Sequence, residues 1–245
     1  MERALVRLAR WRQQLLTNTY RKLHGNQVFS GPFAGMLYGQ ATEGATLPRL
    51  MGCYEAELHP ALAGLRQTAH DLIIDIGCAE GYYAVGFAKF LPHCKVVGFD
   101  LSEAARTACQ ALAQTNGVAA RVQTEREFKP ETLRDIVSGR RVLVFCDIEG
   151  AEAELLDPVR TPQWSEVDLI VEVHECFRKG LVDLINRRFA ETHHIEWIRQ
   201  SPSVRRDLPD WVSGLSHLDQ ILCTWEWRAG PTPWAVMKSR SLHAR

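Results

Sequence analysis

Four residues between positions 75 and 100 have the types and the spacing of a nucleotide-binding turn. Asp75 lies in an apolar run, Gly77 and Gly81 follow it, and Asp100 comes about 20 residues beyond the turn. Glycine lets the backbone turn sharply and approach a ligand closely. An acid at this distance is suited to accept hydrogen bonds from ribose hydroxyls. Together the four positions predict a site for a cofactor that contains a ribose.

A β-α-β unit is needed to bring these residues together. Residues 72–76 form an apolar run, as is typical of a strand that is buried on both faces of a parallel sheet. Residues 82–91 have an apolar helical face, and residues 95–99 predict a second strand that ends next to Asp100. Ligands of such units bind outside the carboxyl ends of the strands. We therefore expect the glycine turn and the acid at one rim of the sheet.

The turn does not fit a dinucleotide. That fingerprint would place glycine at positions 77, 79 and 82, whereas this chain has Ala79 and the bulky Tyr82. The pattern Asp75-x-Gly77-x-x-x-Gly81 instead resembles motif I of class I S-adenosylmethionine (SAM) methyltransferases. The alternative, in which both glycines only form a tight turn, stays open.

The resemblance implies which residues contact SAM. The glycine loop would approach the amino-acid tail of the cofactor, and the acid that ends the second strand would accept both ribose hydroxyls. Residues just past the third strand would meet the adenine. The implied cofactor contacts are Asp75, Gly77, Cys78, Glu80, Gly81, Tyr82, Asp100, Leu101, Ser102, Glu125 and Asp147.

A second group of acids follows the strands expected at 141–147 and 168–173. The stretch FCDIEGAEAELL and the later IVEVHE resemble the FkbM-type branch of class I methyltransferases, which shows Asp-x-Glu-Gly-x-Glu after the fourth strand and an acid at the end of the fifth. The matching residues are Asp147, Glu149, Gly150, Glu152 and Glu172. The resemblance covers roughly residues 70–175. It implies O-methylation of sugars, polyketides and related small molecules.

These residue types suit transfer of a methyl group to a hydroxyl. Adjacent strands should bring Asp147 and Glu172 to one rim, His174 could remove the proton of the acceptor, and Glu149 could hold the acceptor. Elements just before the first strand commonly cover SAM in this family. The predicted catalytic residues are His174, Asp147, Glu149 and Glu172, and the predicted substrate contacts are Tyr54, Glu55, Glu149, Glu172 and His174. The alternative is that these acids cap neighbouring helices.

The same side chains are oxygen and nitrogen donors of the kind that bind Mg²⁺ or Mn²⁺. A divalent metal would lower the pKa of the acceptor and orient a diol. The sequence does not favour this reading over the metal-free one, and no residue is assigned as a metal ligand.

The whole chain has the composition of a globular protein. It has 245 residues, of which 46% are hydrophobic, and a formal net charge of zero, so a broad basic surface for nucleic acid is not expected. The longest apolar runs are too short for a membrane span. Seven cysteines without a Cys-x-x-Cys pair favour reduced thiols and a cytoplasmic protein.

The alternation of strands and helices predicts an α/β fold, a Rossmann-like doubly wound sheet of seven strands, mostly parallel with the last strand antiparallel. We expect a helix at 177–189, a strand at 193–198 and a closing strand at 234–237. Residues 1–68 would form an N-terminal helical extension or lid, and residues 69–245 the SAM-binding domain. The helix at 2–24 is basic and amphipathic, which suits a domain cap, a homodimer arm or contact with a membrane surface.

The sequence therefore predicts a SAM-dependent methyltransferase that acts on a small polar metabolite, by O-methylation. One alternative keeps SAM but changes the chemistry, to N-methylation or to a reaction without methyl transfer. Another is a non-catalytic partner protein with the same fold.

Overall fold

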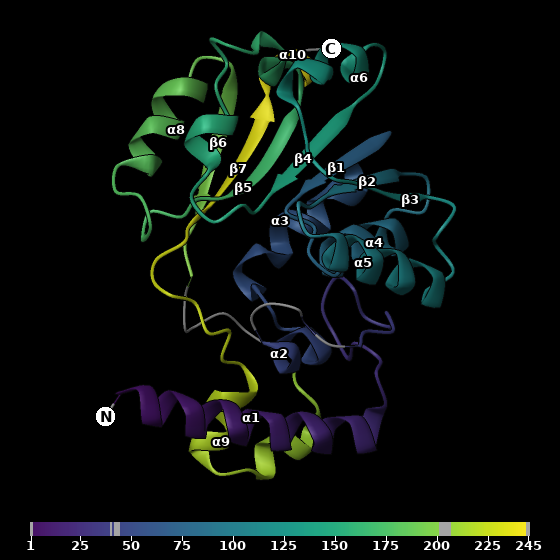
Figure 1. The fold of residues 1–245 in the computed structure, drawn as a ribbon, viewed down its shortest axis with the longest axis vertical. Coiled ribbons are helices and arrows are strands. Elements are labelled where there is room, and N and C mark those ends of the chain that lie inside the picture. The colour runs from purple at the N-terminus through teal and green to yellow at the C-terminus, as the bar shows by residue number, and fades with distance from the viewer. Residues whose placement is uncertain (1, 40, 42–44, 201–206, 244–245) are drawn as a thin grey trace.

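A seven-stranded sheet forms the centre of the computed structural model (Figure 1), which describes residues 2–39, 41, 45–200 and 207–243. The strands are β1 (Leu72–Ile76), β2 (Lys95–Phe99), β3 (Val122–Glu125), β4 (Val142–Cys146), β5 (Asp168–Glu172), β6 (His193–Ile198) and β7 (Trp234–Ser239). The helices are α1 (Glu2–His24), α2 (Thr46–Met51), α3 (His59–Gly64), α4 (Tyr82–Phe90), α5 (Glu103–Thr115), α6 (Leu133–Val137), α7 (Glu152–Leu155), α8 (Leu181–Phe189), α9 (His217–Cys223) and α10 (Arg240–His243).

The strand order is β3-β2-β1-β4-β5-β7-β6. Strands β1 to β5 pair in parallel, and β7 pairs antiparallel with both β5 and β6. The predicted fold class, a mostly parallel Rossmann-like sheet with an antiparallel last strand, is confirmed. The carboxyl ends of β1, β2, β4 and β5 meet at one rim, as predicted for the site.

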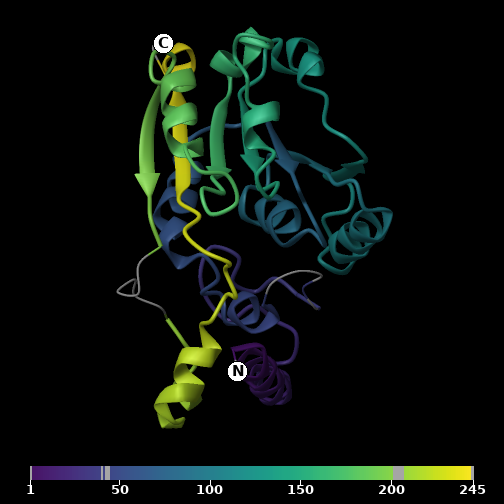
Figure 2. The ribbon, with the colours of Figure 1, turned by 60° about the vertical axis from the view of Figure 1, so that its left-hand side comes forward.

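Both faces of the sheet are covered, which explains the uninterrupted apolar runs of the central strands. Ile73 joins a core with α4 and α5 on one face, whereas Ile74 joins a core with α6 and α8 on the other. The turned view in Figure 2 shows helices on both sides of the sheet. The rim at the carboxyl ends of the strands is therefore held between two layers of helices.

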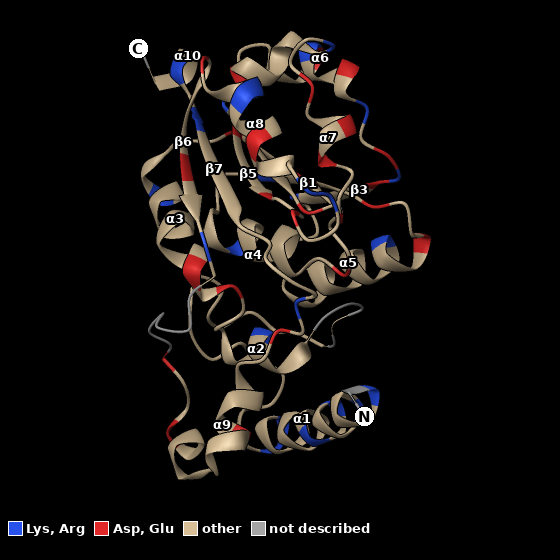
Figure 3. Ribbon diagram, turned by 90° about the vertical axis from the view of Figure 1, so that its left-hand side faces the viewer, with Lys and Arg blue, Asp and Glu red and all other residues tan. Residues whose placement is uncertain are grey.

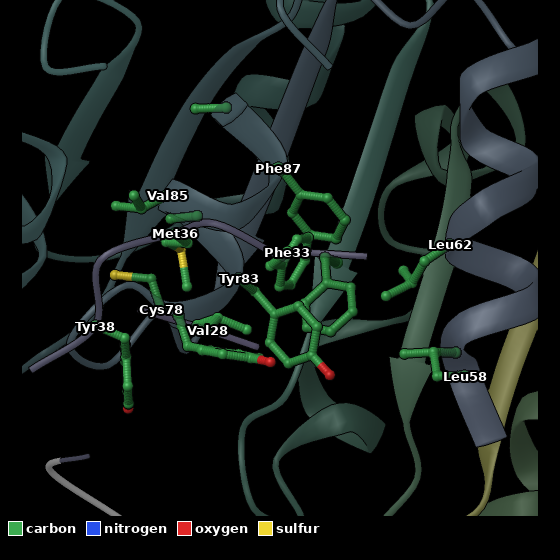
Figure 4. Close-up of a cluster of buried hydrophobic side chains, with 14 of the residues drawn as sticks. Val28, Phe33, Met36, Tyr38, Leu58, Leu62, Cys78, Tyr83, Val85 and Phe87 are labelled. Atoms are coloured by element: carbon green, nitrogen blue, oxygen red, sulfur yellow. The ribbon is translucent and has the colours of Figure 1, made fainter. Parts of the chain in front are cut away.

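Residues 26–38 pack against α4, the helix that follows the glycine turn. The ring of Phe33 meets Tyr82, Tyr83 and Phe87 edge-on, with centroids 5.3, 5.7 and 5.7 Å apart. Gly86 leaves room for this ring, because a Cβ there would lie 2.7 Å from it. Figure 4 shows Phe33 beside Tyr83 and Phe87 in this buried cluster. The segment therefore holds α4 in place from outside the sheet.

A helical base of α1, α2 and α9 lies beyond the carboxyl ends of the parallel strands (Figures 1 and 2). Helices α1 and α9 are joined by an ion pair between Arg12 Nη2 and Asp219 Oδ2, 2.7 Å apart, across 207 residues of sequence. Gln13 Nε2 also donates to the carbonyls of Leu222 and Trp225, at 2.7 and 2.9 Å. The base thus contains residues from both predicted domains, and the division at residue 68 remains a prediction.

Most predicted elements are found, and one helix begins later than expected. The helix at 2–24 and the strand at 193–198 have the predicted bounds. The helix expected from residue 177 begins at Leu181, because Gly180 adopts the left-handed conformation with φ 83°. The carboxylate of Glu175 accepts hydrogen bonds from the Gly180 and Val182 amides, at 2.6 and 2.9 Å. These contacts fix a turn in front of the helix.

Among the described residues, every helix is too short or too polar to cross a bilayer.

Candidate active site

The turn after β1 needs glycine at two positions. Gly77 has φ 88°, and a Cβ there would lie 1.8 Å from the carbonyl oxygen of Asp147. Gly81 has φ 91°, and its Cβ would lie 2.6 Å from the Sγ of Cys109. The first glycine lets the β1 turn touch the β4 turn, and the second lets α4 pack on α5. The two glycines thus allow close packing of the turns and helices that form this rim of the sheet.

Asp100 is held at this turn by backbone donors. Its Oδ2 accepts from the Ala79 amide at 3.0 Å, and its Oδ1 accepts from the Ser102 amide at 2.8 Å. Ser102 caps α5, as its Oγ accepts from the Ala105 amide at 3.3 Å. These bonds fix the orientation of the Asp100 carboxylate, which is partly exposed and lines a cavity.

Asp75 lies beneath the turn rather than in the cavity. It is 1% exposed, and burial together with the charge of Asp100 raises its pKa to about 8. The backbone of Ala84 donates to it and partly offsets this effect. Its position suits support of the turn from below.

A cavity of about 600 Å³ opens at the carboxyl ends of β1, β2 and β4. Its wall combines apolar side chains such as Ile76, Phe99 and Phe128 with ten charged residues, so it can bind a ligand that has both apolar and polar parts. Among the predicted cofactor residues, those that line it are Gly77, Asp100, Leu101 and Asp147. The others, Cys78, Glu80, Gly81, Tyr82, Ser102 and Glu125, are not in this lining. Past β3 the wall is made by residues 126–128 instead of Glu125.

Arg49 from α2 is a cavity residue that the sequence did not reveal. Its Nη1 lies 3.3 Å from Oε1 of the buried Glu80, and the hydroxyl of Tyr38 donates to the same oxygen. The guanidinium also lies over the ring of Tyr54, 4.3 Å from its centroid. These contacts hold a buried cation at the glycine turn. Glu80, predicted to touch the cofactor, acts in this structure by holding Arg49.

Three predicted catalytic residues come together beside the cavity. His174 Nε2 lies 3.5 Å from Asp147 Oδ1 and 3.8 Å from Glu172 Oε2. On the other side of the ring, Nδ1 lies 2.6 Å from Oε1 of Glu152, a side chain that is fully buried. The imidazole stacks on Phe177 with centroids 5.6 Å apart. Glu152 therefore orients the ring so that Nε2 faces the two carboxylates.

The charges of this group shift its pKa values upward. Burial opposes protonation of His174, but the hydrogen bond to Glu152 and the charge of Glu172 outweigh it and raise the pKa of His174 above its ordinary value. Burial and the neighbouring Glu172 and Glu55 raise the pKa of Asp147 well above its usual range. Groups of side chains with shifted pKa values are typical of active sites.

The remaining predicted substrate residues border this group. Glu55 is 1% exposed, accepts from the hydroxyl of Tyr83, and has its pKa raised to about 8 by burial and by Glu172. The pKa of Tyr54 is raised by burial and by Glu55, with smaller effects from Glu172 and Asp147. Glu149 is exposed, lines the cavity and has φ 55°. Their roles in binding remain predictions.

Arg228, also missed in the sequence, is surrounded by four carboxylates. Its guanidinium nitrogens lie 2.9 to 3.5 Å from oxygens of Glu55, Glu57, Glu172 and Glu226. Although burial opposes its charge, these acids raise the pKa of Arg228 further. The arginine thereby joins the segment after α2 and the segment before β7 to the end of β5.

The group at the rim also has a donor set that fits a divalent cation. One ligand atom from each of Asp147, Glu172 and His174 can be chosen so that all lie within 4.8 Å of one another. Two carboxylates and an imidazole suit Mn²⁺ or Mg²⁺, and Glu152 would orient the imidazole as such partners do. Glu172, however, already pairs with Arg228 at 3.0 Å, which offsets its charge.

Comparisons with known proteins agree with this geometry. A family model described as a methyltransferase domain matches residues 73–151. Human methyltransferase 10 domain containing protein aligns over 94% of this chain and 97% of its own, with a TM-score of 0.52 and 9% identity. The chain has a methyltransferase fold. No curated protein sequence matches it.

Further solved structures align with lower scores. The O-methyltransferase TomG from Streptomyces achromogenes, in complex with SAM, has a TM-score of 0.49 and 16% identity, over 76% of this chain and 79% of its own. An O-methyltransferase from Bacillus cereus, in complex with SAH, has a TM-score of 0.45 and 14% identity, over 75% of this chain and 80% of its own. The matched segment of the methyltransferase fold, residues 73–151, includes Gly77, Asp100 and Asp147.

Proposed function

We propose that this chain is a SAM-dependent methyltransferase that methylates a hydroxyl of a small polar metabolite, in the manner of FkbM-like enzymes. One observation carries the proposal: Asp147 lines the cavity beside the glycine turn and also lies 3.5 Å from His174 Nε2. A methyltransferase must place its acceptor next to the methyl donor, and a residue shared by the two regions puts them in contact.

The cavity offers partners for the ribose, the amino-acid tail and the adenine of the cofactor. Asp100, oriented by two backbone amides, suits the ribose hydroxyls. Arg49 is the buried cation of the cavity wall and suits the carboxylate of the amino-acid tail. Leu101, Phe99 and Phe128 provide apolar surface for the adenine. The turn at Gly77 lets backbone approach the ligand without a side chain between.

The second region suits a hydroxyl acceptor because a hydroxyl must lose its proton. In the neutral tautomer His174 donates from Nδ1 to Glu152 and presents the lone pair of Nε2 to the rim. Glu152 then stabilises the imidazolium that forms, because it carries the opposite charge. An imidazole held in this way is a base for an alcohol.

SAM supplies an electrophilic methyl group and leaves as S-adenosylhomocysteine. The acceptor oxygen forms the new bond to the methyl carbon as the bond from sulfur to that carbon breaks, and His174 Nε2 takes the hydroxyl proton. Asp147 and Glu172 hold the acceptor in line, and the buried surroundings exclude water. Methylation of an amine, the main alternative, would use the same acids to bind a cation. A product analysis separates the two, and release of methylthioadenosine would indicate a reaction without methyl transfer.

The first test is calorimetric titration with S-adenosylhomocysteine. We expect the wild-type chain to bind it and Asp100→Ala to bind it at least about tenfold more weakly, because hydrogen bonds to a charged group are lost. Asp183→Ala, in the first turn of α8 and exposed, is the matched control and should keep the wild-type affinity. Absence of binding to the wild-type chain would refute the proposal and favour a non-catalytic partner protein.

Substitution of His174, the proposed general base, should lower the rate of catalysis without changing cofactor binding. We expect His174→Ala to lower the turnover of a methylated acceptor by about 10²-fold or more, with unchanged affinity for S-adenosylhomocysteine. Glu152→Gln removes a contact that raises the pKa of His174, so the rising limb of the pH–rate profile should move to lower pH. A Glu152→Gln variant whose rate falls without any movement of the profile would show that Glu152 has only a structural role.

Metal removal tests the other use of the same donors. If a divalent cation were bound, Asp147, Glu172 and His174 would hold it, and it would act as a Lewis acid on the acceptor oxygen. Because Arg228 already offsets the charge of Glu172, we expect dialysis against a chelator to leave turnover unchanged. Loss of activity that Mg²⁺ or Mn²⁺ restores would reassign His174 from base to ligand.

A further inference from the structure

Exposed apolar side chains are concentrated on the helical base. Of the twelve large hydrophobic residues that are exposed in the described chain, seven lie on α1, on α9 or just after it. They are Leu5, Leu8, Trp11, Leu23, Leu218, Ile221 and Trp225. Such a concentration on one end of a molecule marks an interaction surface more often than chance exposure.

The first half of α1 contributes most to this surface. Leu5, Leu8 and Trp11 are spaced three residues apart, so they lie along one side of the helix, and each is 62% exposed. No side chain from 3 to 12 is buried, whereas Gln13, Leu16 and Tyr20 in the second half are. The second half thus anchors α1 to the body, and the first half presents its apolar side outward.

The same half of α1 is strongly cationic. Residues 3–12 contain four arginines and no acid, and Figure 3 shows the basic residues along this helix. Arg12 pairs with Asp219, and Arg10 lies over the ring of Trp227, 5.2 Å from its centroid. Among the described residues, Arg3 and Arg7 form no ion pair. They follow a different side of the helix from the leucines, and their long stems can reach around it.

We infer that the first half of α1, together with α9, docks this enzyme on the surface of a membrane rich in anionic lipids. A helix with leucine and tryptophan on one side and arginine on another lies in the plane of the interface. The apolar side enters the boundary with the acyl chains, and the arginines pair with lipid phosphates.

Charge complementarity selects this occupant. A second copy docked through the same face would bring the arginines of both copies together with few acids between them, since Glu2 is the one acid in the first half of α1 and Asp219 of α9 already pairs with Arg12. A nucleic acid would neutralise the arginines but would leave the leucines and the tryptophan in water. An anionic bilayer would both neutralise the arginines and bury the leucines and the tryptophan. Because the whole chain has a net charge of zero, the attraction is confined to this end.

The test is co-sedimentation of the full chain with vesicles of phosphatidylcholine alone or mixed with phosphatidylglycerol. We expect at least about tenfold stronger partitioning into the mixed vesicles, weakened by salt. Arg3→Gln/Arg7→Gln should reduce partitioning about thirtyfold, at roughly 1 kcal/mol for each arginine. Leu5→Ser/Leu8→Ser should reduce it about tenfold, because apolar area no longer enters the interface.

Matched controls are available elsewhere on the surface. Arg134→Gln removes an exposed charge on α6, and Val159→Ser removes a side chain that is 90% exposed; both should partition like the wild type. All variants should bind S-adenosylhomocysteine with wild-type affinity. Equal partitioning of the wild type into both kinds of vesicle would overturn the inference. So would a dimer in sedimentation velocity that the α1 variants abolish while vesicle binding is absent.

Discussion

Arg228→Met is expected to lower the free energy of unfolding by about 3–5 kcal/mol, because removal of one partner leaves buried charges without compensation. Four carboxylates, from Glu55, Glu57, Glu172 and Glu226, surround this guanidinium. Methionine fills much of the volume but supplies no charge. Urea unfolding measures the loss, and turnover should fall with it because Glu172 is no longer held.

The loss should depend on pH in a defined direction. Without Arg228 the pKa of Glu55, already about 8, would rise further above its unfolded value. A carboxyl with a raised folded pKa is least destabilising at low pH, where it is protonated, and the penalty grows as pH rises toward the folded pKa. Because Glu55 is protonated in both folded proteins well below pH 8, its share of the Arg228→Met deficit should be absent there and should grow as the pH rises above about 8.

An exposed arginine gives the matched control. Arg178 pairs with Glu154 at 2.5 Å, and both side chains are largely exposed. Arg178→Met should cost less than about 1 kcal/mol, as is usual for surface ion pairs. Equal losses for the two variants would show that the four acids around Arg228 are satisfied by other means.

Gly77→Ala is expected to abolish measurable binding of S-adenosylhomocysteine and to cost about 3 kcal/mol or more of stability. Its Cβ would lie 1.8 Å from the Asp147 carbonyl oxygen, so the turns after β1 and β4 would have to separate. That movement changes the cavity and also displaces the Asp147 side chain from His174. Calorimetric titration and urea unfolding measure the two effects.

Gly117→Ala is the control that separates the strain of a positive φ from the steric clash with the Asp147 carbonyl oxygen. Gly117 also has a positive φ, 68°, but a Cβ there would meet nothing within 4 Å. It should cost only about 1–2 kcal/mol, the strain of the left-handed conformation, with normal ligand binding. Wild-type affinity in Gly77→Ala would mean that the close approach of the two turns is not needed for the site.

The sequence allowed the fold to be predicted because its signals are local. The central strands are continuous apolar runs, and the unit from β1 to Asp100 has glycine, helix and acid in a fixed order. The predicted start of α8 was wrong by four residues, because the preceding turn depends on Gly180 and on the carboxylate of Glu175. That contact is between side chain and backbone, and periodicity does not report it.

The site could be predicted only where its residues follow strands. Asp147, Glu172 and His174 meet because the ends of β4 and β5 are adjacent, which the order of elements implied. Arg49 and Arg228 could not be found in this way, because they reach Glu80 and Glu57 across 31 and 171 residues of chain. The available signal in the sequence was a set of acids, such as Glu55 and Glu80, that have no basic residue close to them in the chain.

The position of β7 determines when the sheet can close during synthesis. Both β5 and β6 pair with β7 in this sheet, and β6 has no other strand partner among the described residues. Until residues 234–239 leave the ribosome, the edge of β5 stays open and β6 has nothing to join. A nascent chain halted before Trp234 would therefore expose two strand edges, which invite pairing with other chains. We expect such a chain to depend on chaperones, although the residues that line the cavity, all between 49 and 161, have already been synthesised.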